Sequence, residues 1–350
     1  MKLALITDAW LPQVNGVVTT LQRTRGVLEA LGHSVTVISP EQFRTLPCPT
    51  YPEIRLALLP GRRIARALEA WQPDAIHIAT EGPLGLAAAR YCTRRGLAFT
   101  TSYHTQFPQY LRKRAPIPES WSYAFLRRHH SRARRTLVAT EHQRRDLVAH
   151  GFHNVVIWSR GVDADLFKPG DRSHLALPRP IFAYAGRVAV EKNLDAFLAL
   201  DLPGTKVVIG DGPDRAMLER RYPDARFLGY RFGTDLSGCL ASADAFVFPS
   251  RTDTFGLVML EAMACGTPVA AFPVTGPIDV VTHGYDGVLD ENLRTAALRA
   301  LSLDRADCRR TALAHSWERA AAQFLSHLVG TRGGGELGLD GLAEPSAAGP

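Results

Sequence analysis

The 350-residue sequence contains few cysteines, and their positions favour neither disulfides nor a zinc site. Its five cysteines form no C-x-x-C pair, and none lies beside a histidine at metal-ligand spacing. A disulfide framework is therefore not predicted, and no residue is assigned as a metal ligand. This cysteine usage fits the reducing cytoplasm.

Long hydrophobic runs are also lacking. The N-terminal MKLALITDAWLPQ has one lysine and an apolar run before Asp8 that is too short for a signal peptide or a membrane span. No later run is long enough to span a membrane. We therefore expect a cytoplasmic protein, which at most lies peripherally on the inner face of the membrane.

Two ligand-binding motifs are missing as well. The loop after the first apolar run lacks the G-x-G-x-x-G fingerprint, which argues against a nicotinamide enzyme. No D-x-D motif precedes a cleft strand, so we expect activity without a divalent metal.

The residues that are present suit a globular protein of two domains. The chain is 46% hydrophobic and long enough for two separate cores. Its net charge is +7, and arginine and lysine are concentrated between Arg112 and Arg145. This stretch is either a solvated face or a surface for anionic lipid, while nucleic acid is disfavoured because no binding motif accompanies the charge. Its aromatic residues are interpreted first as core residues that could instead insert at a membrane interface. They are Trp121, Tyr123 and Phe125.

Strand-like and helix-like segments alternate along the chain. LALIT, VVTTLQRTRGVLEALGH and SVTVIS indicate a β-α-β unit, and the alternation continues to VVIWS at 155–159. The Asp-, Pro- and Gly-rich segment 163–180 is predicted to be a linker, after which IFAYA at 181–185 starts a second alternating run. We therefore predict the α/β class, with two doubly wound, Rossmann-like domains. Ligands bind outside the carboxyl ends of such strands, so the two domains are expected to face an interdomain cleft.

The expected domains are residues 1–165 and 166–310. A long amphipathic helix is predicted over 311–330, and we expect it to pack back toward the first domain. The remaining tail, 331–350, is rich in Gly, Ala and Pro and is expected to be flexible.

Candidate residues of the first domain follow its predicted strands. Asn15-Gly16 opens the first predicted helix, whose amides would face the cleft as an anion site, although a simple turn would also use this pair. His104 follows the strand LAFTTS, where a histidine is often only a hydrogen-bonded loop residue. Its place at the carboxyl end of a strand makes it a candidate.

Candidate cations of the second domain lie in AYAGRVAVEKN. Gly186 and Arg187 come at the end of a strand, and Lys192 is predicted to lie one turn into the next helix. A guanidinium and an ammonium group beside a helix N-terminus can neutralise a diphosphate without a metal. A surface ion pair, such as Glu191 with Arg187, is the structural alternative.

Two acids lie eight positions apart in TDTFGLVMLE. Asp253 is predicted in a loop after a strand, and Glu261 in a helix that begins near Phe255 or Gly256. Amides at Gly256 and Leu257 lie between them and could bind phosphate or sugar oxygens. A glutamate on an otherwise apolar helix is costly unless it has a hydroxyl or cationic partner, which the ribose of a nucleotide would supply.

These segments together resemble a known family. From ITDAWLPQVNGVV to about Leu328, the sequence is similar to retaining glycosyltransferases of family four, which have the GT-B fold. The segments that carry the resemblance are YHTQFPQY, SRGVDADLFKP, GRVAVEKN, IGDGPDRAMLE, FLGY and DTFGLVMLE.

The resemblance implies roles for matching residues. In the first domain, which holds the acceptor in this fold, Gly16 resembles the glycine that approaches the donor phosphate and the acceptor. His104 matches the histidine beside the transferred sugar. In the second domain, which binds the nucleotide sugar, Arg187 and Lys192 match the basic pair on the diphosphate, and Glu261 matches the glutamate on the ribose. The backbone near the donor comprises Phe255, Gly256 and Leu257.

One departure from the family bears on the donor. The first acid of the motif is Asp253, whereas the family usually has Glu. TDTFG resembles the subgroup that transfers mannosyl, glucosyl or sulfoquinovosyl groups to lipid-type acceptors, which would place Asp253 on a sugar hydroxyl. Base contacts are expected from the loops near Gly229 and Tyr230.

The implied activity is hexosyl transfer, mannosyl or glucosyl, from a GDP- or UDP-linked sugar to a hydroxyl of a lipid or glycan, with no additional cofactor. Fixed positive groups would stabilise the leaving diphosphate. The acceptor would attack from the face that the diphosphate leaves, so Asp253 and Glu261 are not assigned as a glycosidase-like acid and base. A nucleotide-sugar epimerase, a dehydrogenase and a non-catalytic nucleotide-sugar-binding relative remain as alternatives.

Overall fold

The computed structural model describes residues 1–48, 51–104 and 118–335, and it divides the chain into two compact units. Unit 1 comprises Met1–Ser159 with the chain from Trp317 onward, and unit 2 comprises Arg160–Ser316. The chain thus passes from unit 1 to unit 2 slightly before the expected boundary at 165, and it returns to unit 1 near the end. The functional roles expected of the two domains stay predictions.

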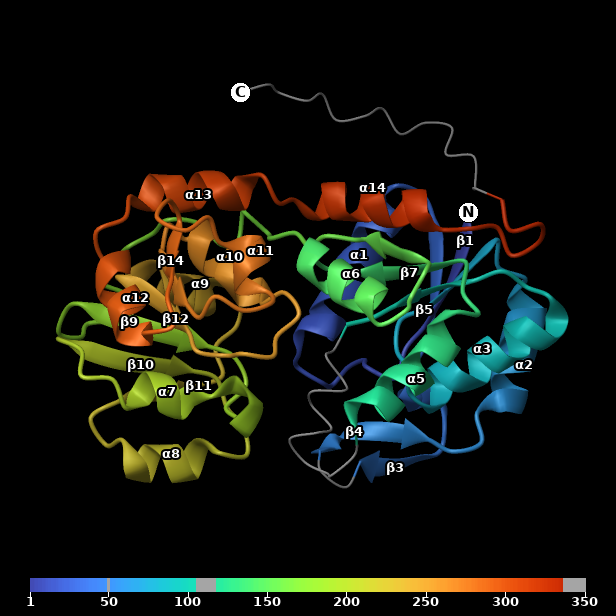
Figure 1. The fold of residues 1–350 in the computed structure, drawn as a ribbon, viewed down its shortest axis with the longest axis horizontal. Coiled ribbons are helices and arrows are strands. Elements are labelled where there is room, and N and C mark those ends of the chain that lie inside the picture. The colour runs from blue at the N-terminus through green and yellow to red at the C-terminus, as the bar shows by residue number, and fades with distance from the viewer. Residues whose placement is uncertain (49–50, 105–117, 336–350) are drawn as a thin grey trace. The chain divides into compact units, whose positions relative to one another are not determined.

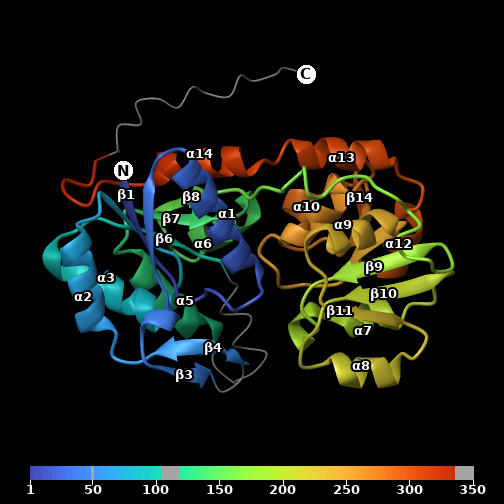
Figure 2. The same ribbon diagram turned by 180° about the vertical axis from the view of Figure 1, so that it is seen from behind.

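Each unit is built on a six-stranded parallel sheet (Figures 1 and 2). The prediction of two doubly wound α/β domains is therefore confirmed. Parallel strands are covered on both faces, and for this reason segments such as IFAYA are apolar throughout and fully buried.

The strands of unit 1 run in the order β2-β1-β5-β6-β7-β8. Their bounds are β1 Lys2–Ile6, β2 Ser34–Ile38, β5 Ala75–Ile78, β6 Thr100–Ser102, β7 Arg135–Val138 and β8 Val155–Ile157. The helices are α1 Gly16–Ala30, α2 Gly61–Trp71, α3 Pro83–Arg95, α5 Glu119–His130, α6 Glu141–Ala149 and α14 Trp317–His327. A 3-10 turn, η1 Pro40–Gln42, and an antiparallel hairpin of β3 Thr45–Cys48 and β4 Tyr51–Ala57 complete the unit.

Alternate residues of β1 face opposite cores of unit 1. Leu3 and Leu5 pack in the core that includes Leu21 of α1, whereas Ala4 and Ile6 pack in the core that includes Leu84 of α3. Helices α1 and α3 therefore cover opposite faces of the sheet. The strand order also reverses between β1 and β5, which is the topological switch point of this sheet.

Unit 2 repeats this design in the order β11-β10-β9-β12-β13-β14, with its switch point between β9 and β12. Its strands are β9 Ile181–Ala185, β10 Thr205–Ile209, β11 Arg226–Gly229, β12 Ala245–Phe248, β13 Val269–Ala271 and β14 Gly287–Leu289. Its helices are α7 Leu194–Leu198, α8 Arg215–Arg221, α9 Gly233–Ser242, α10 Leu257–Ala264, α11 Pro277–Val280, α12 Leu293–Ala300 and α13 Arg305–Leu313, with a 3-10 turn η2 Val190–Lys192.

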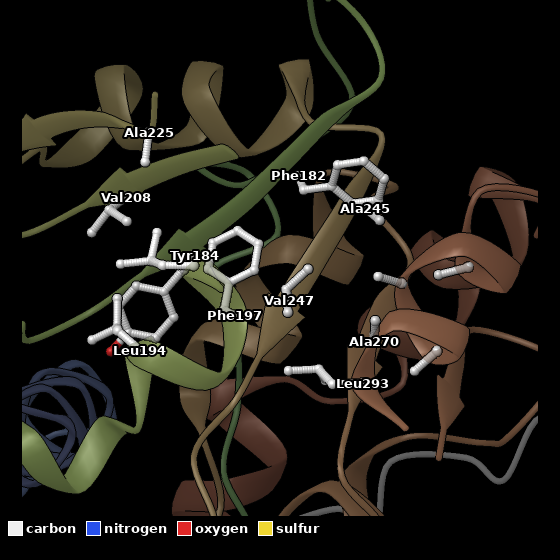
Figure 3. Close-up of a cluster of buried hydrophobic side chains, with 14 of the residues drawn as sticks. Phe182, Tyr184, Leu194, Phe197, Val208, Ala225, Ala245, Val247, Ala270 and Leu293 are labelled. Atoms are coloured by element: carbon white, nitrogen blue, oxygen red, sulfur yellow. The ribbon is translucent and has the colours of Figure 1, made fainter. Parts of the chain in front are cut away.

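Aromatic side chains fill the core beneath the switch point of unit 2. Phe182 and Tyr184 of β9 lie in one buried cluster with Phe197 of α7 and Val247 of β12 (Figure 3). Burial of each large apolar side chain contributes about 1.5–3 kcal/mol, so this cluster holds the adjoining loops firmly at the ends of β9 and β12.

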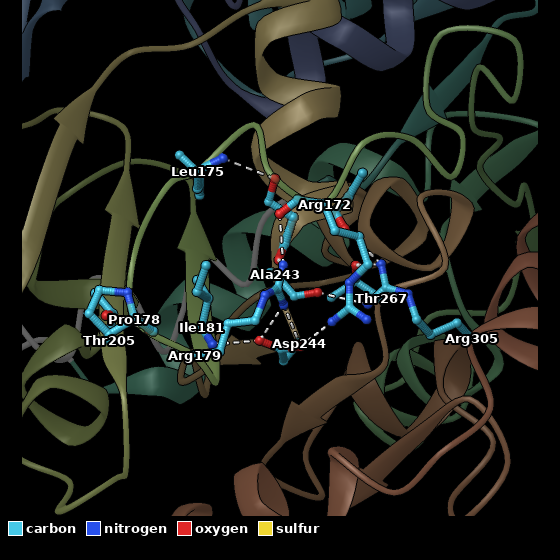
Figure 4. A network of polar contacts seen from close by, with 12 residues as sticks. Arg172, Leu175, Pro178, Arg179, Ile181, Thr205, Ala243, Asp244, Thr267 and Arg305 are labelled. Carbon is cyan, nitrogen blue, oxygen red and sulfur yellow. Dashed lines mark hydrogen bonds and ion pairs between the residues drawn. The ribbon is translucent and has the colours of Figure 1, made fainter.

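The segment 163–180 is part of unit 2 and is bonded to the rest of that unit, contrary to its interpretation as a linker. Arg179 Nη1 lies 2.7 Å from both carboxylate oxygens of Asp244, Arg172 pairs with the same carboxylate, and the Ile181 amide donates to it at 2.7 Å (Figure 4). Composition predicted the irregular backbone correctly, but it could not reveal these side-chain anchors.

The helix predicted over 311–330 is instead two helices, α13 and α14. Between them, the Val162 amide donates to the His315 carbonyl at 3.0 Å, and Val162 forms a bridge with Ser316. These tertiary bonds replace helical ones, so the helix ends although its amphipathic pattern continues. Helix α14 belongs to unit 1, where the Trp158 indole donates to the Ala320 carbonyl at 3.1 Å.

Candidate active site

The loops that leave the switch point of unit 2 bring a cation and an acid together. Lys192 lies after β9 and Asp253 after β12, and these strands pair directly. Lys192 Nζ is 2.6 Å from Asp253 Oδ1, with 22% of each side chain exposed. The sequence predicted both residues at this edge but did not predict that they form an ion pair.

Lys192 lies in a 3-10 turn and not in a helix as predicted. Helix α7 begins only at Leu194, because Asn193 adopts a left-handed conformation with φ of 56°. The Asn193 side-chain Nδ2 also donates to the Pro249 carbonyl at 3.1 Å, which connects this turn to the end of β12. The helical periodicity of the segment does not reveal this break.

Asp253 carries an unsatisfied acceptor. Its Oδ2 is buried and accepts no hydrogen bond from any described residue. A buried carboxylate oxygen without a donor costs free energy, on the order of 1–3 kcal/mol, which a bound hydroxyl group would offset. Asp253 is thus suited to bind a hydroxyl of a ligand while Lys192 compensates its charge.

Tyr184 and Gly186 shape the loop that carries Arg187. The Tyr184 hydroxyl donates to the Arg187 carbonyl at 2.9 Å. Gly186 has φ of 146°, and a Cβ at this position would lie 2.8 Å from that hydroxyl. Burial, followed by the negative charges of Asp253 and Glu191, raises the pKa of Tyr184, so the phenol stays neutral and donates.

Helix α10 starts next to Asp253, as predicted, with Gly256 as its N-cap in a left-handed conformation. A Cβ on Gly256 would lie 2.9 Å from the Phe248 ring, so the turn requires glycine. Phe255 is buried, Leu257 opens the helix, and Glu261 lies half-buried in its second turn.

Gly276 is a residue of this site that the sequence did not reveal. A Cβ on Gly276 would lie 2.9 Å from the Asp253 carbonyl and 3.3 Å from the Phe255 carbonyl. The lack of a side chain at Gly276 therefore allows the loop after β13 to approach the backbone of the Asp253 loop. The positive φ of 93° gives a second reason for glycine here.

Two aromatic side chains follow β11 in unit 2. Tyr230 and Phe232 are both exposed, and their rings stack with centroids 5.8 Å apart and planes 21° apart. They come directly after Gly229, the position near which base contacts are expected.

In unit 1, the first helix begins at Gly16 as predicted, but its first amides are not open. Asn15 Oδ1 accepts from the amides of Val17 and Val18, both at 3.0 Å. Asn15 is therefore the N-cap of α1, and its side chain binds two of the amides at the helix N-terminus where an anion site was expected.

His104 follows β6 and is largely buried, with its ring edge-on to Trp158 at 5.8 Å between centroids. The part of the motif YHTQFPQY that follows His104 lies outside the described residues, as do Arg112, Lys113 and Arg114. His104 is thus at the carboxyl end of the sheet, where the sequence placed it.

Sequence reasoning missed two acids at the same edge of unit 1. Asp8 follows β1 and accepts from the amides of Leu84 and Gly85 at 2.9 and 3.3 Å, and its burial raises its pKa. Glu81 follows β5, and its Oε1 lies 3.1 Å from Nε2 of the buried His130. Both acids follow a strand end just as His104 does, and this was the signal that could have found them.

The basic stretch of unit 1 is not one uniform patch. Arg144 and Arg145 both pair with Glu141, and Arg135 donates to the Ser326 carbonyl. The exposed cations on α5 are Arg127 and Arg128. The interpretation of all three aromatic residues as core residues holds for Tyr123 but is wrong for the other two: Trp121 is 73% and Phe125 46% exposed.

A group of possible metal ligands lies elsewhere in unit 2. One ligand atom each of His174, Asp235 and Cys239 lies within 4.8 Å of the others, a proximity that the spacing in the sequence did not indicate. His174 Nε2 is 2.9 Å from Asp235 Oδ1, and Asp235 also pairs with Arg231. Burial raises the pKa of Cys239 to about 11, which opposes formation of a thiolate ligand.

Two doubly wound α/β units in one chain are the architecture of GT-B glycosyltransferases. The model of Glycosyltransferase Family 4 matches residues 14–166, and that of Glycosyl transferases group 1 matches residues 179–303. The chain belongs to glycosyltransferase family 4, and it is a retaining enzyme of the hexosyltransferase class. Members of this family use a nucleotide-sugar donor.

Three relatives extend over most of the chain. A GDP-mannose-dependent alpha-mannosyltransferase of Mycobacterium tuberculosis is 31% identical over 95% of this chain and 97% of its own length. Sulfoquinovosyl transferase SQD2 of Arabidopsis thaliana is 31% identical over 78% of this chain and 60% of its own. A GDP-mannose-dependent alpha-(1-6)-phosphatidylinositol dimannoside mannosyltransferase of M. tuberculosis is 28% identical over 94% and 96%.

A solved structure shares the fold. Sucrose-phosphate synthase from Thermosynechococcus elongatus superposes with a TM-score of 0.75 at 21% identity, over 92% of this chain and 97% of that one. Among the described helices, none combines the length and the apolar character that crossing a membrane requires.

Proposed function

We propose that the protein transfers a mannosyl group, with retention of configuration, from GDP-mannose to a hydroxyl of a lipid-borne or glycan acceptor. The observation that carries the proposal is the pair at the switch point of unit 2, where Lys192 forms an ion pair with Asp253 and no residue in the described part of the chain donates to the buried Asp253 Oδ2. This arrangement suits a sugar that presents a hydroxyl to the acid and a diphosphate to the cation. The mannosyl donor is favoured by the names of the M. tuberculosis relatives.

Catalysis in this proposal depends on fixed positive charge. Arg187 and Lys192 stabilise the diphosphate as negative charge develops on it, because preorganised cations lower the free energy of a transition state more than that of the ground state. The acceptor hydroxyl attacks on the side from which the diphosphate departs and gives its proton to the leaving phosphate oxygen. His104 stays proposed beside the transferred sugar, and Glu261 on the ribose.

The remaining donor contacts follow the strand ends of unit 2. The backbone of Gly186, Phe255, Gly256 and Leu257 is proposed to approach the donor. The exposed, stacked Tyr230 and Phe232 offer an apolar face near the proposed base position. Because base stacking tolerates different bases, a UDP-linked glucosyl or sulfoquinovosyl donor is the second candidate, supported by the likeness to sulfoquinovosyl transferase SQD2.

A lipid acceptor is supported by the surface of α5. Trp121 and Phe125 lie one helical turn apart and are exposed, with Arg128 within a further turn. Exposed aromatic and basic side chains on one helix are typical of a surface that binds at a membrane interface. We therefore propose that the enzyme works peripherally on a cytoplasmic membrane face.

The test is a donor panel of GDP-mannose, GDP-glucose, UDP-glucose and UDP-sulfoquinovose. Thermal shift measures binding, and mass spectrometry measures both slow donor hydrolysis and transfer to lipid extracts or soluble glycans. The expected result is the largest shift and the fastest turnover with GDP-mannose. Binding without hydrolysis or transfer would indicate a non-catalytic relative, and turnover of the sugar without an acceptor product would indicate an epimerase.

A further inference from the structure

The switch point of unit 1 is a second place where the fold predicts a ligand. The loops after β1 and β5 diverge there, because α1 and α3 leave toward opposite faces of the sheet. In doubly wound domains, ligands bind outside the carboxyl ends of the strands, at the point where neighbouring loops diverge in this way.

At this switch point, side chains of the protein already accept hydrogen bonds from amides in the first turns of α1 and α3. Helix α1 is capped by the Asn15 side chain, and the amides of Leu84 and Gly85 at the start of α3 are bonded to the Asp8 carboxylate. The Asp8 side chain packs closely against the residue before α3, since a Cβ on Gly82 would lie 2.4 Å from Cγ of Asp8. Four amides in the first turns of α1 and α3 are thus bonded within the protein, and a negative group fills the place of an anion at α3.

Glu81 follows β5 at this switch point, and a hydrogen bond anchors its side chain. Its side chain is 21% exposed, and its Oε1 lies 3.1 Å from Nε2 of His130, which is fully buried. A carboxylate only accepts, so in the neutral ring Nε2 donates to Glu81 and Nδ1 accepts from the Thr101 hydroxyl at 2.9 Å. Thr101 in turn contacts Thr136 at 3.1 Å. This buried chain of polar groups holds Glu81 as a preorganised acceptor of hydrogen bonds.

We propose that Glu81 binds the acceptor through its neutral hydroxyl groups, and that it selects a polyol or sugar without a phosphate next to the reacting hydroxyl. The proposal rests on the proposed transfer function and specifies the substrate class at its acceptor side. A carboxylate accepts hydrogen bonds from hydroxyls but repels a phosphate, and the four amides bonded to Asn15 and Asp8 cannot compensate that repulsion.

The experiment compares matched acceptors that differ by one phosphate. The probes are methyl α-mannoside with mannose 6-phosphate, myo-inositol with its monophosphate, and glycerol with glycerol 3-phosphate, each with the donor preferred by the wild type. The variants are Glu81→Gln and Glu81→Lys. The matched control is Glu69→Gln, which removes an exposed acid paired with Arg95 on the surface of unit 1.

We expect the wild type to use the neutral member of a pair at least ~10-fold better, as kcat/KM. Loss of a charged hydrogen-bonding group predicts that Glu81→Gln lowers kcat/KM for the neutral acceptor about 10- to 100-fold, chiefly through KM. Donor hydrolysis and donor KM stay at the wild-type level, and Glu81→Lys shifts the preference toward the phosphorylated member. Glu69→Gln behaves as wild type.

Three results would overturn this inference while leaving the donor chemistry intact. They are a wild-type preference for phosphorylated acceptors, unchanged acceptor kinetics in Glu81→Gln, and donor hydrolysis without transfer to any probe. Failure of the wild type to turn over any nucleotide sugar would instead refute the proposed function. Thermal unfolding of each variant separates these outcomes from misfolding.

Discussion

The ion pair between Lys192 and Asp253 gives the sharpest prediction. Substituting Lys192→Met keeps the length of the side chain and removes its charge. Coulomb attraction across 2.6 Å is about 1.6 kcal/mol in a water-like medium and about 6 kcal/mol at an effective dielectric constant of 20. Desolvation and side-chain entropy offset most of it, and with both groups partly exposed the net contribution is about 1–2 kcal/mol.

Lys192→Met should therefore lower the free energy of unfolding by about 1–2 kcal/mol, since it leaves Asp253 without a counter-charge. The effect on transfer should be larger. The activation free energy should rise by about 2–4 kcal/mol, which is what a preorganised cation contributes to stabilising a developing negative charge. In kcat/KM this is roughly a 30- to 1,000-fold loss, and Arg187→Ala should lose a comparable amount with little change in stability.

The assay is a double-mutant cycle of Lys192→Met and Asp253→Asn. Urea unfolding measures stability, and initial rates with saturating acceptor measure transfer. The double variant should be about 1–2 kcal/mol more stable than the sum of the single effects predicts, because the partner of each lost group is also gone. Zero coupling in stability, or a Lys192→Met variant with wild-type transfer, would refute the assignment of this pair to the donor site.

Three further predictions follow from other parts of the structure. Gly186→Ala should destabilise the protein by about 1–3 kcal/mol in urea unfolding and weaken donor affinity in thermal shift measurements. Gly170→Ala is the control and should change neither quantity, because the nearest atom to its Cβ would lie 3.8 Å away. Prolonged EDTA treatment should leave the transfer rate unchanged, and a loss restored by Mn²⁺ would contradict a diphosphate site made of side chains. Replacing Trp121 and Phe125 by Ser together with Arg128→Gln should reduce co-sedimentation with anionic liposomes at low salt, since each basic residue contributes about 1 kcal/mol that salt screens. The control is a variant that removes the charges of the two α6 arginines paired with Glu141, and it should bind liposomes as the wild type does. Equal recovery of all three proteins in the supernatant would show that the exposed face of α5 contacts only solvent.

Much of the fold was predictable because buried segments can be recognised in the sequence by their apolar residues. Strands such as 181–185 are buried on both faces and are apolar at every position, so they were found at nearly their true bounds. The ends of those strands then located Arg187 and Asp253 without knowledge of side-chain contacts. Strand β14 was missed, since GVL offers only two large apolar residues between Asp286 and Asp290.

What the sequence could not predict depends on tertiary bonds. The break before α14 is made by Val162, which lies far from it along the chain, and the pattern around His315 remains that of a helix. The left-handed turn at Asn193 and the capping of α1 by Asn15 depend on one and two side-chain hydrogen bonds, respectively. The exposure of Trp121 was opposite to the usual place of a tryptophan, so composition favoured the wrong interpretation.

The return of the chain to unit 1 at α14 has a consequence for synthesis on the ribosome. Trp158 packs against Phe324, with ring centroids 4.7 Å apart, and the core of unit 1 includes several more residues of α14 and its C-terminal end. Unit 2 is one uninterrupted segment and can complete its core as soon as residue 316 has emerged. Unit 1 is the first to be translated, but its core is complete only after α14 has emerged. The second unit to be translated is therefore the first that can finish folding.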